Sequence, residues 1–502
     1  MYKKLSTLWA MALFLFVALL LPLYIPKSGY SYIGTEKYSF FFYGIIPFLI
    51  TSVFFLIYAA YQNIRYKKAV TKLSKTDWFV LSFALCSTLS YFCSAYKDIA
   101  LFGNEEWNMG LVSQLFFVFI YFVISRYIDY IKGCIYAVCI IGFPMALLTI
   151  VNRFGYYPLP IKGQHPLYVS TIGNINWFCG YFIMTVAMEL ILYFMSKSLR
   201  VKLLSGIALF FSLMALICQG SMSGYITLFV LLLLLLQPAL KSKQVFLTYL
   251  EIYVLLFSGC TLTYITGYFI PGSYVEYDPI INLVAFSPLP CICLFFIAIF
   301  YIFIYFGIKT LNLSFLYKYI VGTVIALFIV YLALCLINTC FPAITPFLNG
   351  NSFFTFDRFW WSTRGGTYAI GVQAFYSLPW YQKPVGIGPD CFLTYVYDNL
   401  EKVTVAKAFR TQPLANAHNE FLTMFVNTGL LGGISYVGIF VCSIKNTYRN
   451  TNPFIKMLLF GILGYMINNF FSFQQVISTS FAFTLLGLLE NLLRKERKNA
   501  AD

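Results

Sequence analysis

Charge is scarce in this sequence. Only 10% of its 502 residues are Asp, Glu, Lys or Arg, whereas 60% are hydrophobic and 20% are aromatic. A soluble domain of this size could not bury so much apolar surface, so the soluble globular classes are excluded. Apolar runs near the ~20 residues of a membrane helix recur from end to end, and no soluble domain interrupts them. The composition therefore predicts one compact polytopic membrane protein.

Histidine is rarer still, and the cysteines show no metal-binding pattern. The chain has 2 histidines and 13 cysteines. The cysteines lie mostly inside apolar runs, so we interpret them as small core residues. Cys340 and Cys391 share one long loop, but we do not expect a disulfide between them. We therefore expect no metal and no cofactor.

Hydropathy predicts about 14 membrane helices in an all-α bundle. The first follows a basic head, is too long for a cleaved signal peptide, and has no A-x-A site behind it. The predicted spans are residues 7–25, 39–61, 77–94, 109–126, 134–152, 176–196, 203–219, 222–237, 245–269, 285–308, 318–338, 417–442, 454–472 and 476–493.

The basic residues give an orientation. The chain has 34 Lys and Arg residues and a net charge of +16, and its basic residues cluster in every second short loop. This distribution is typical of cytoplasmic loops rather than of a nucleic-acid-binding surface. We therefore expect no nucleic-acid partner, and both termini in the cytoplasm, which agrees with an even number of spans.

One loop is too long for a simple connector, and such loops usually carry function. It separates an N-terminal transmembrane bundle, residues 1–338, from the C-terminal helices and basic cytoplasmic tail, residues 417–502. The loop itself, residues 339–416, is expected to be extracytoplasmic. Its many aromatic residues suggest short helices lying at the membrane surface.

His418 is the first candidate for chemistry. It stands in ANAHNEF, at the outer end of a predicted span, and the topology puts His165 on the same face. An imidazole titrates near neutral pH and can take a proton from a hydroxyl. An outward-facing site has no access to ATP or nucleotide sugars. The alternative is that His418 only caps or anchors its helix.

Two arginines in the long loop are the second candidate. Arg358 and Arg364 lie in FTFDRFWWSTRGGTYAIGVQAF. Guanidinium binds phosphate oxygens in bidentate fashion and keeps its charge, which suits a lipid diphosphate at a membrane surface. The alternative is that the arginines anchor the loop at the interface.

Two further stretches are weaker signals. The paired glycines of KPVGIGPDCF, residues 383–392, predict a tight turn. Asn174 and Asn176 in STIGNINWF open a predicted span, where they either hydrogen-bond sugar hydroxyls or cap the helix.

The combination is more specific than its parts. In order, the chain carries RGGTY, PVGIGPDCF, AHNEFL and NTGLLGG between two late spans, within about residues 350–435. This set resembles the O-antigen ligase and O-antigen polymerase family of bacterial envelope proteins, and GNINWF before an earlier span is similar too. Hydropathy and the large late outer loop extend the likeness over most of the chain.

The resemblance implies a multi-pass enzyme of the bacterial cytoplasmic membrane with a fold like that of class C membrane glycosyltransferases. It implies metal-independent transfer of an oligosaccharide from undecaprenyl diphosphate to a glycan or glycolipid acceptor on the outer face. A chain-length regulator is a possible further partner. Arg364 matches the arginine that holds the diphosphate, and His418 matches the histidine thought to activate the acceptor hydroxyl. Substrate contacts are expected from Arg358, Asn419, Lys383, Asn174, Asn176 and Glu420.

The sequence also departs from the family pattern. Met222 in QGSMSGY and Trp107 in LFGNEEWNMGL stand where arginine is frequent in the family. We hypothesise that Arg358 or Lys383 substitutes for the missing positive charge.

Three alternatives stay open. The shared motifs do not separate a polymerase from a ligase, although abundant Lys, Tyr and Phe, typical of low-GC Gram-positive bacteria, favour a capsular polysaccharide or exopolysaccharide polymerase. Glu276 and Asp278 in SYVEYDP would suit a metal-dependent glycosyltransferase. A transporter or lipid-glycan flippase would need charges deep in the spans, which we expect to be nearly charge-free.

Overall fold

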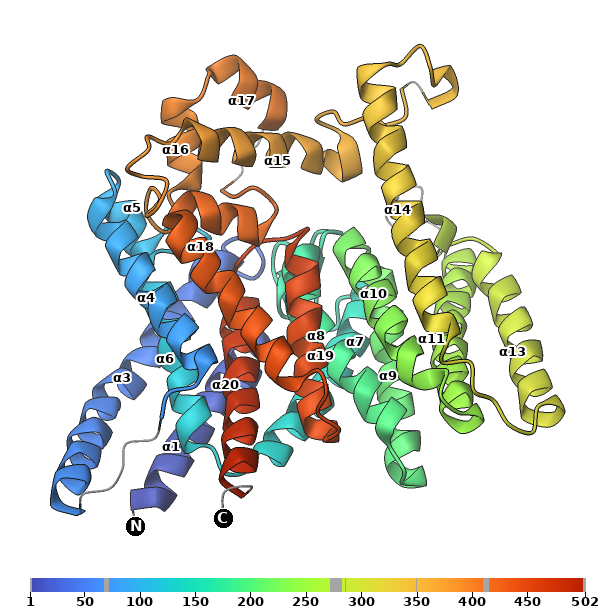
Figure 1. Ribbon diagram of the computed structural model, residues 1–502, viewed down its shortest axis with the longest axis horizontal. Helices are drawn as coiled ribbons and strands as arrows, with labels where there is room; N and C mark the ends of the chain where they lie inside the picture. The colour runs from blue at the N-terminus through green and yellow to red at the C-terminus, as the bar shows by residue number, and fades with distance from the viewer. Residues whose placement is uncertain are drawn as a thin grey trace.

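The computed structural model describes residues 2–66, 72–270, 282–284, 286–348, 350–409 and 415–499. Within these ranges the chain is almost entirely helical, which confirms the all-α prediction (Figure 1). The sheet in the described part is a single antiparallel pair, β1 (Tyr168–Val169) with β2 (Gly173–Asn174).

The helices follow one another with short connections. The first half contains α1 (Tyr2–Leu15), the π-helix η1 (Phe16–Leu20), α2 (Leu21–Leu23), α3 (Ile33–Tyr66), α4 (Lys75–Cys93), α5 (Lys97–Phe102), α6 (Leu111–Tyr127), α7 (Ile131–Arg153), α8 (Ile175–Met195), α9 (Leu199–Gln219), α10 (Met222–Ala239) and α11 (Lys243–Phe269). The second half contains α13 (Leu289–Gly307), α14 (Leu316–Cys340), the 3-10 helix η2 (Pro346–Leu348), α15 (Trp360–Ser377), α16 (Phe392–Asn399), α17 (Lys402–Phe409), α18 (Glu420–Thr447), α19 (Pro453–Asn469) and α20 (Val476–Asn499).

Eleven helices in the described residues are long and apolar enough to cross a membrane, so the chain has the architecture of a multi-pass membrane protein. The predicted spans at 77–94, 109–126 and 454–472 coincide with α4, α6 and α19, which are shorter or more polar than those eleven. The count of 14 spans therefore stays a prediction.

The helices of the long loop form a separate layer. In Figure 1, α15, α16 and α17 lie across one end of the bundle, while α1 begins and α20 ends at the opposite end. The expectation of helices in this loop is confirmed, and their position at a membrane surface stays a prediction. We call residues 360–409, which contain α15 to α17, the cap.

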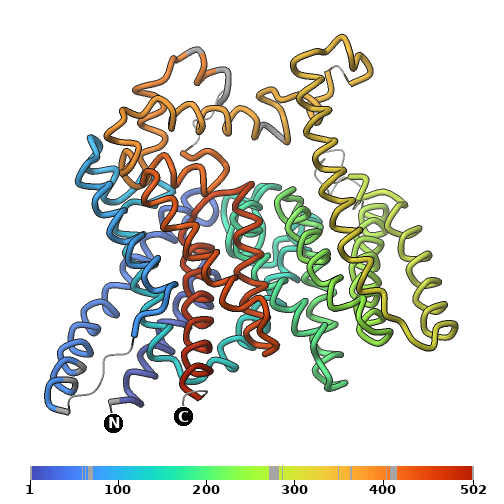
Figure 2. The backbone as a smooth tube through the Cα atoms, viewed as in Figure 1, coloured from blue at the N-terminus to red at the C-terminus, as the bar shows by residue number. Residues whose placement is uncertain are grey.

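Burial divides the bundle into a core and a fringe. Most side chains of α8 are buried, whereas those of α13 and α14 are mostly exposed, and the tube in Figure 2 shows α13 and α14 at one edge of the molecule. Exposed apolar helices are what a lipid environment requires. All 13 cysteines are free, Cys340 and Cys391 included, as expected.

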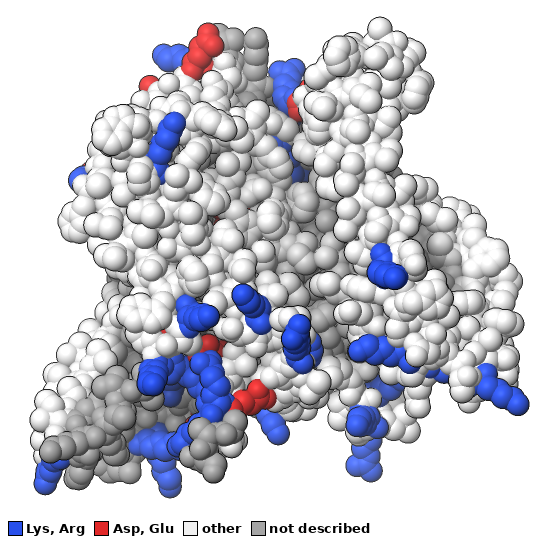
Figure 3. Space-filling model, viewed as in Figure 1, with Lys and Arg blue, Asp and Glu red and all other residues white. Residues whose placement is uncertain are grey.

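Charge is distributed unevenly along the bundle. On the face shown in Figure 3, Lys and Arg gather towards the end where α1 begins and α20 ends, with fewer near the cap. This asymmetry is our reason for proposing that the chain termini are cytoplasmic and that the cap lies outside.

Candidate functional site

Arg364 lies near the start of α15 as a cation without a counter-ion. Its Nε donates to the carbonyl oxygen of Phe471 at 3.1 Å and its Nη1 to that of Trp361 at 3.3 Å. No carboxylate in the described part of the chain forms an ion pair with it. Burial lowers the pKa of the Arg364 guanidinium, since its charge is poorly solvated. An anionic ligand would relieve this cost.

The space beside Arg364 is large and apolar. A cavity of about 420 Å³ lies between α10, α14, α15 and the segment 351–354, and we call it the Arg364 cavity. Its walls are mainly aromatic and aliphatic, and Arg364 is the one charged residue among those described in its lining. A ligand with an apolar chain and an anionic head would satisfy both features.

His418 occupies an unusual backbone conformation just before α18. Its φ of 50° is in the left-handed region, which residues other than glycine rarely adopt. The backbone N–H of His418 donates to Asn416 Oδ1 at 3.0 Å, and its ring meets the ring of Phe473 edge-on at 5.2 Å. Strain held in place by surrounding contacts is typical of functional sites.

Arg364 and His418 lie near the same short segment of the chain, and the prediction that they act on one substrate stays a prediction. Both contact the short segment between α19 and α20, Arg364 at Phe471 and His418 at Phe473. Burial and the nearby positive charge of Arg364 lower the pKa of His418 to about 3. The imidazole is therefore neutral at physiological pH and has a lone pair that can accept a proton.

The residues around His418 form a helix N-cap. Asn419 Oδ1 accepts from the backbone N–H of Leu422 at 3.0 Å, and Thr423 Oγ1 accepts from that of Ala417 at 3.1 Å. These bonds satisfy groups at the start of α18 and fix the preceding turn. The Asn419 side chain also interacts with the hydroxyl of Tyr368 on α15, so Asn419 joins α18 to the cap.

Glu420 is held by hydrogen bonds within the protein, and its predicted substrate contact stays a prediction. Its carboxylate is buried and accepts hydrogen bonds from the Tyr465 hydroxyl, at 3.0 Å to each oxygen, and from Tyr436 and Asn469. With both oxygens occupied by protein donors, Glu420 fixes the start of α18 against α19. Such fully bonded networks specify one geometry.

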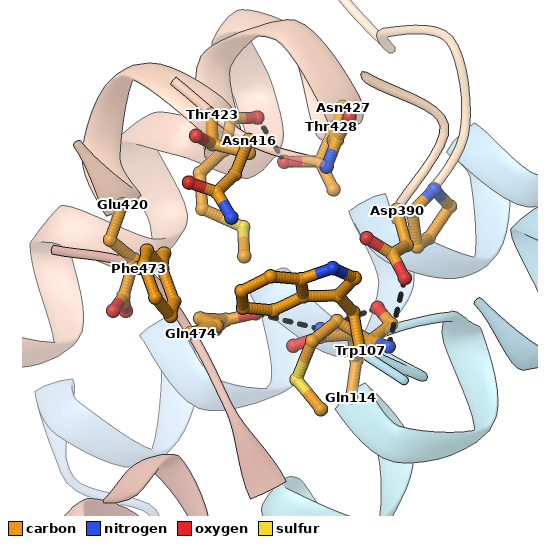
Figure 4. Close-up of a pocket in the computed structure, with 13 residues that line it drawn as sticks. Trp107, Gln114, Asp390, Asn416, Glu420, Thr423, Asn427, Thr428, Phe473 and Gln474 are labelled. Atoms are coloured by element: carbon orange, nitrogen blue, oxygen red, sulfur yellow. Dashed lines mark hydrogen bonds between the residues drawn. The ribbon is translucent and has the colours of Figure 1, made fainter. Parts of the chain in front are cut away.

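A second cavity is lined by Phe473, whose ring also contacts His418. Figure 4 shows Asp390, Gln114, Gln474 and Trp107 around it. Its volume of about 20 Å³ is enough for one water molecule. The side-chain oxygens of Asn427 and Gln114 are buried without a hydrogen-bond partner in the described residues, so polar groups are available to bind such a water.

Asp390 is a residue that sequence reasoning missed. Its φ is 60°, and its Oδ2 accepts from the backbone N–H groups of Asn104 at 2.8 Å and Met109 at 3.0 Å. It thereby fastens the turn before α6 to the cap. Burial raises the pKa of Asp390 to about 7. Its place directly after the paired glycines was the only signal in the sequence.

The paired glycines themselves do more than form a turn. Within α18, Gly429 has a φ of 69° and interrupts the helix. The cap loop completes the interrupted hydrogen bonding: Gly388 N–H donates to the Asn427 carbonyl at 2.9 Å, and Leu430 N–H donates to that of Lys383 at 2.9 Å. A Cβ on Gly386 would lie 2.3 Å from the Asn427 oxygen, so only glycine permits this approach. The PVGIG loop and the NTG segment of α18 are therefore held together by backbone hydrogen bonds, and we call this contact the joint.

Two other predicted cations lie away from Arg364. Arg358 is exposed, with its guanidinium 4.6 Å from the ring centre of Phe359, and it lines a different cleft. Lys383 contributes its backbone to the joint with α18. Neither lines the Arg364 cavity, so the hypothesis that one of them replaces the missing arginines is not supported.

The positions of those missing arginines do lie at the site. Met222 lines the Arg364 cavity, and the ring of Trp107 packs on Phe473 at 4.7 Å. Their side chains supply no charge. The site of this chain therefore combines one half-buried cation with apolar walls.

The two asparagines before α8 make protein contacts. The Asn174 side chain accepts from the backbone N–H of Asn176 at 2.9 Å and caps α8, as the structural alternative predicts. Asn176 Oδ1 accepts from the hydroxyl of Ser221 at 2.9 Å, which itself bonds Ser223 in the lining of the Arg364 cavity. Asn176 therefore helps to fix one wall of the Arg364 cavity through Ser221 and Ser223.

The remaining candidates are peripheral or lie outside the described residues. His165 is exposed, and its Nδ1 accepts from the backbone N–H of Leu167 at 3.1 Å within its own loop. Glu276 and Asp278 lie outside the described residues. No cluster of three or more His, Cys, Asp or Glu suited to a metal ion occurs among the residues that were searched, which are the described ones.

Glu189 is an exception to the expectation that the spans are nearly charge-free. Glu189 lies in α8, its side chain is fully buried, and neither carboxylate oxygen has a hydrogen-bond partner among the described residues. Ser212 on α9 approaches it. The sequence analysis overlooked this glutamate because it stands in an otherwise apolar run.

Compared with known proteins, the chain matches no family model and no curated protein.

Proposed function

We propose that this protein is a glycosyltransferase of the bacterial cytoplasmic membrane that uses an undecaprenyl diphosphate-linked oligosaccharide as its donor. Transfer to an acceptor hydroxyl would take place on the extracytoplasmic face. The observation that carries the proposal is Arg364, a cation at the edge of an apolar cavity that forms no ion pair within the described residues and lies close to a neutral histidine. The apolar cavity suits the isoprenoid chain, and the guanidinium suits the diphosphate.

The proposed transfer step is a direct displacement. The acceptor hydroxyl oxygen forms a bond to the anomeric carbon of the donor glycan while the bond from that carbon to the diphosphate oxygen breaks. The electron pair stays on the diphosphate, where Arg364 stabilises the added negative charge. The hydroxyl proton passes to the free ring nitrogen of His418. The products are the extended or attached glycan, undecaprenyl diphosphate and a protonated His418.

Donor binding would also strengthen the base. In the free protein, the positive charge of Arg364 contributes to the low pKa of His418. A bound diphosphate would offset that charge and raise the pKa of His418 towards the range in which a general base is effective. His418 would then be activated when the donor is in place.

The test is reconstitution of the purified protein with a lipid-diphosphate oligosaccharide, with and without an acceptor glycolipid. Products of increasing length from the donor alone would identify a polymerase, which the composition favours. A single mass shift of the acceptor would identify a ligase. No glycan transfer under either condition would contradict the proposal.

Lipid-glycan transport remains a second candidate because of Glu189. A carboxyl group buried inside a membrane helix is typical of transporters. Movement of a fluorescent lipid-linked glycan across proteoliposome membranes, lost in Glu189→Gln and kept in His418→Ala, would favour transport over transfer.

A further inference from the structure

The cap contains a cleft that the proposed donor site does not use. It has a volume of about 400 Å³, within the range of small-molecule sites, and it lies between the segment 356–360, α15 and α17. We call it the cap cleft. Its lining combines the aromatic side chains of Trp360 and Tyr368 with the polar side chains of Asp357 and Gln373.

The cap cleft and the Arg364 cavity share α15 as a wall. Successive residues of an α-helix are about 100° apart, so Gln373 projects roughly opposite to Arg364, whereas Tyr368, four residues after Arg364, lies on nearly the same side as Arg364. Arg364 lines one cavity and Gln373 the other. One helix therefore separates an apolar cavity that contains a cation from a cleft with mixed polar and aromatic walls.

The glycines that follow Arg364 shape the cleft. A Cβ on Gly365 would lie 2.0 Å from the carbonyl oxygen of Asp357, so only glycine lets the preceding turn fold back on α15. Gly366 N–H donates to the Arg358 carbonyl at 3.4 Å across the same contact. The RGG sequence thus sets the wall of the cleft as well as the position of Arg364.

Tyr368 connects the cleft to the reacting groups. It lines the cleft, and its hydroxyl donates to the Phe470 carbonyl at 2.7 Å, one residue before the carbonyl that receives Arg364. The same hydroxyl interacts with Asn419, the neighbour of His418. A ligand in the cap cleft would therefore have one end close to His418.

We infer that the cap cleft binds the acceptor saccharide, in a space separate from the cavity proposed for the donor lipid. Aromatic rings can pack against the C–H faces of a sugar, and carboxylate and amide groups can bond its hydroxyls. A lipid chain would desolvate the exposed Asp357 and Gln373 without replacing their hydrogen bonds. The inference rests on the proposed transferase function.

The test uses one variant that fills the cleft and one matched control. Ala369 lines the cleft and is exposed, so Ala369→Trp occupies it without disturbing the core. Val372 is exposed on the same helix and lines neither cavity, so Val372→Trp adds the same bulk elsewhere. Steady-state transfer with reconstituted protein and saturating donor would give the KM for the acceptor, and a separate titration would give the Kd for the donor.

We expect Ala369→Trp to raise the acceptor KM at least about tenfold while the donor Kd stays within about twofold of wild type, with Val372→Trp unchanged. Gln373→Ala should raise the acceptor KM by a smaller factor. An unchanged acceptor KM in Ala369→Trp, or equal losses in both tryptophan variants, would overturn the inference while leaving the transferase intact.

If the wild type transfers no glycan, the proposed function fails, and direct binding then decides on the cleft. The probe is the oligosaccharide released by hydrolysis of the donor diphosphate bond. Binding by wild type and Val372→Trp but not by Ala369→Trp would support a saccharide site. Equal binding by all three proteins, or no binding by any of them, would rule out a saccharide site in the cap cleft.

Discussion

Two arginine sites at opposite ends of the bundle differ in what balances their charge. Near the chain termini, Arg126 and Arg494 both pair with the buried carboxylate of Asp77, with Arg126 Nη2 3.1 Å from Asp77 Oδ1. The Tyr121 hydroxyl and the backbone N–H of Ser74 also donate to Asp77, at 2.9 and 2.7 Å. Near the cap, Arg364 has carbonyl partners but no ion pair with a carboxylate among the described residues.

The difference separates a structural cation site from a ligand site. The Asp77 site joins α4, α6 and α20 and is complete without any ligand. The Arg364 site is incomplete, because a poorly solvated cation facing an apolar cavity needs an anion. Substitutions at the first site should therefore affect folding, and those at the second should affect the donor and the reaction.

The largest effect is expected at His418. His418→Ala should lower the turnover number about 10²–10⁴-fold, the range typical of a lost general base, while donor affinity is retained. Transfer rate and donor Kd measured on one preparation check this. His165→Ala is the control, since His165 lies exposed in a separate loop. If His165→Ala transfers no glycan while His418→Ala remains active, the assignment of His418 as the general base is wrong.

Asp77 should show the opposite behaviour. Asp77→Asn removes the carboxylate shared by Arg126 and Arg494, of which Arg494 retains Glu490, and should lower the free energy of unfolding by about 3–5 kcal/mol. Transfer per folded molecule should stay unchanged. Asp129→Asn is the control, because Asp129 pairs with Lys3 and Lys495 in a partly exposed position and is expected to cost about 0–1 kcal/mol. Thermal unfolding in mild detergent would compare them.

Arg364 should affect binding rather than folding. Arg364→Ala should weaken donor binding by about 1.5–3 kcal/mol, since a charge-assisted bond to phosphate already forms in the ground state. Arg364→Lys should recover part of this loss, because lysine keeps the charge without the planar fork. The control is Arg358→Ala, which lies outside the cavity. A large fall in melting temperature for Arg364→Ala would instead mark a structural role.

The pH dependence should be small. Burial and Arg364 hold the pKa of His418 at about 3, so His418 stays neutral as the pH falls from 7.5 to 5. The pH dependence of kcat/KM for the donor reports the titrating groups of the free enzyme. Protonation of His418 should therefore lower this kcat/KM less than about twofold. Asp390 titrates at about pH 7, so the profile is measured in Asp390→Asn. A fall with an apparent pKa near 6.5 would contradict the burial of His418.

No effect at all is expected from chelation. Transfer should persist in EDTA, because Arg364 supplies the positive charge that the diphosphate needs. Activity lost in EDTA and restored by magnesium or manganese would direct attention to Glu276 and Asp278.

The sequence predicted the features that depend on local pattern. Apolar runs located the helices. The chemistry of Arg364 and His418, with the likeness of RGGTY and AHNEF to a known family, selected two residues that lie near the same segment of the chain, and their roles stay predictions. Asn174 caps α8, which is one of the two roles the sequence left open for it, because that role depends on neighbouring residues alone.

Features that depend on packing between distant segments could not be predicted. The partner of Asp77 is Arg494, at the other end of the chain. The joint between Gly386 and the helix interruption at Gly429 requires two distant backbone segments in contact. The amino-acid sequence does not show which distant segments meet. The hydrogen bonds to Glu420 were not predicted, because Tyr465 and Asn469 come from α19, and Tyr436 stands 16 residues further along α18.

The most direct test of the account is binding of radiolabelled undecaprenyl diphosphate to the purified protein and to Arg364→Ala, with undecaprenol as competitor. The account predicts saturable binding by wild type, much weaker binding by the variant, and little displacement by undecaprenol, because the diphosphate supplies the missing counter-ion. Equal binding by the two proteins, or full displacement by undecaprenol, would contradict the claim that the Arg364 charge is reserved for the donor.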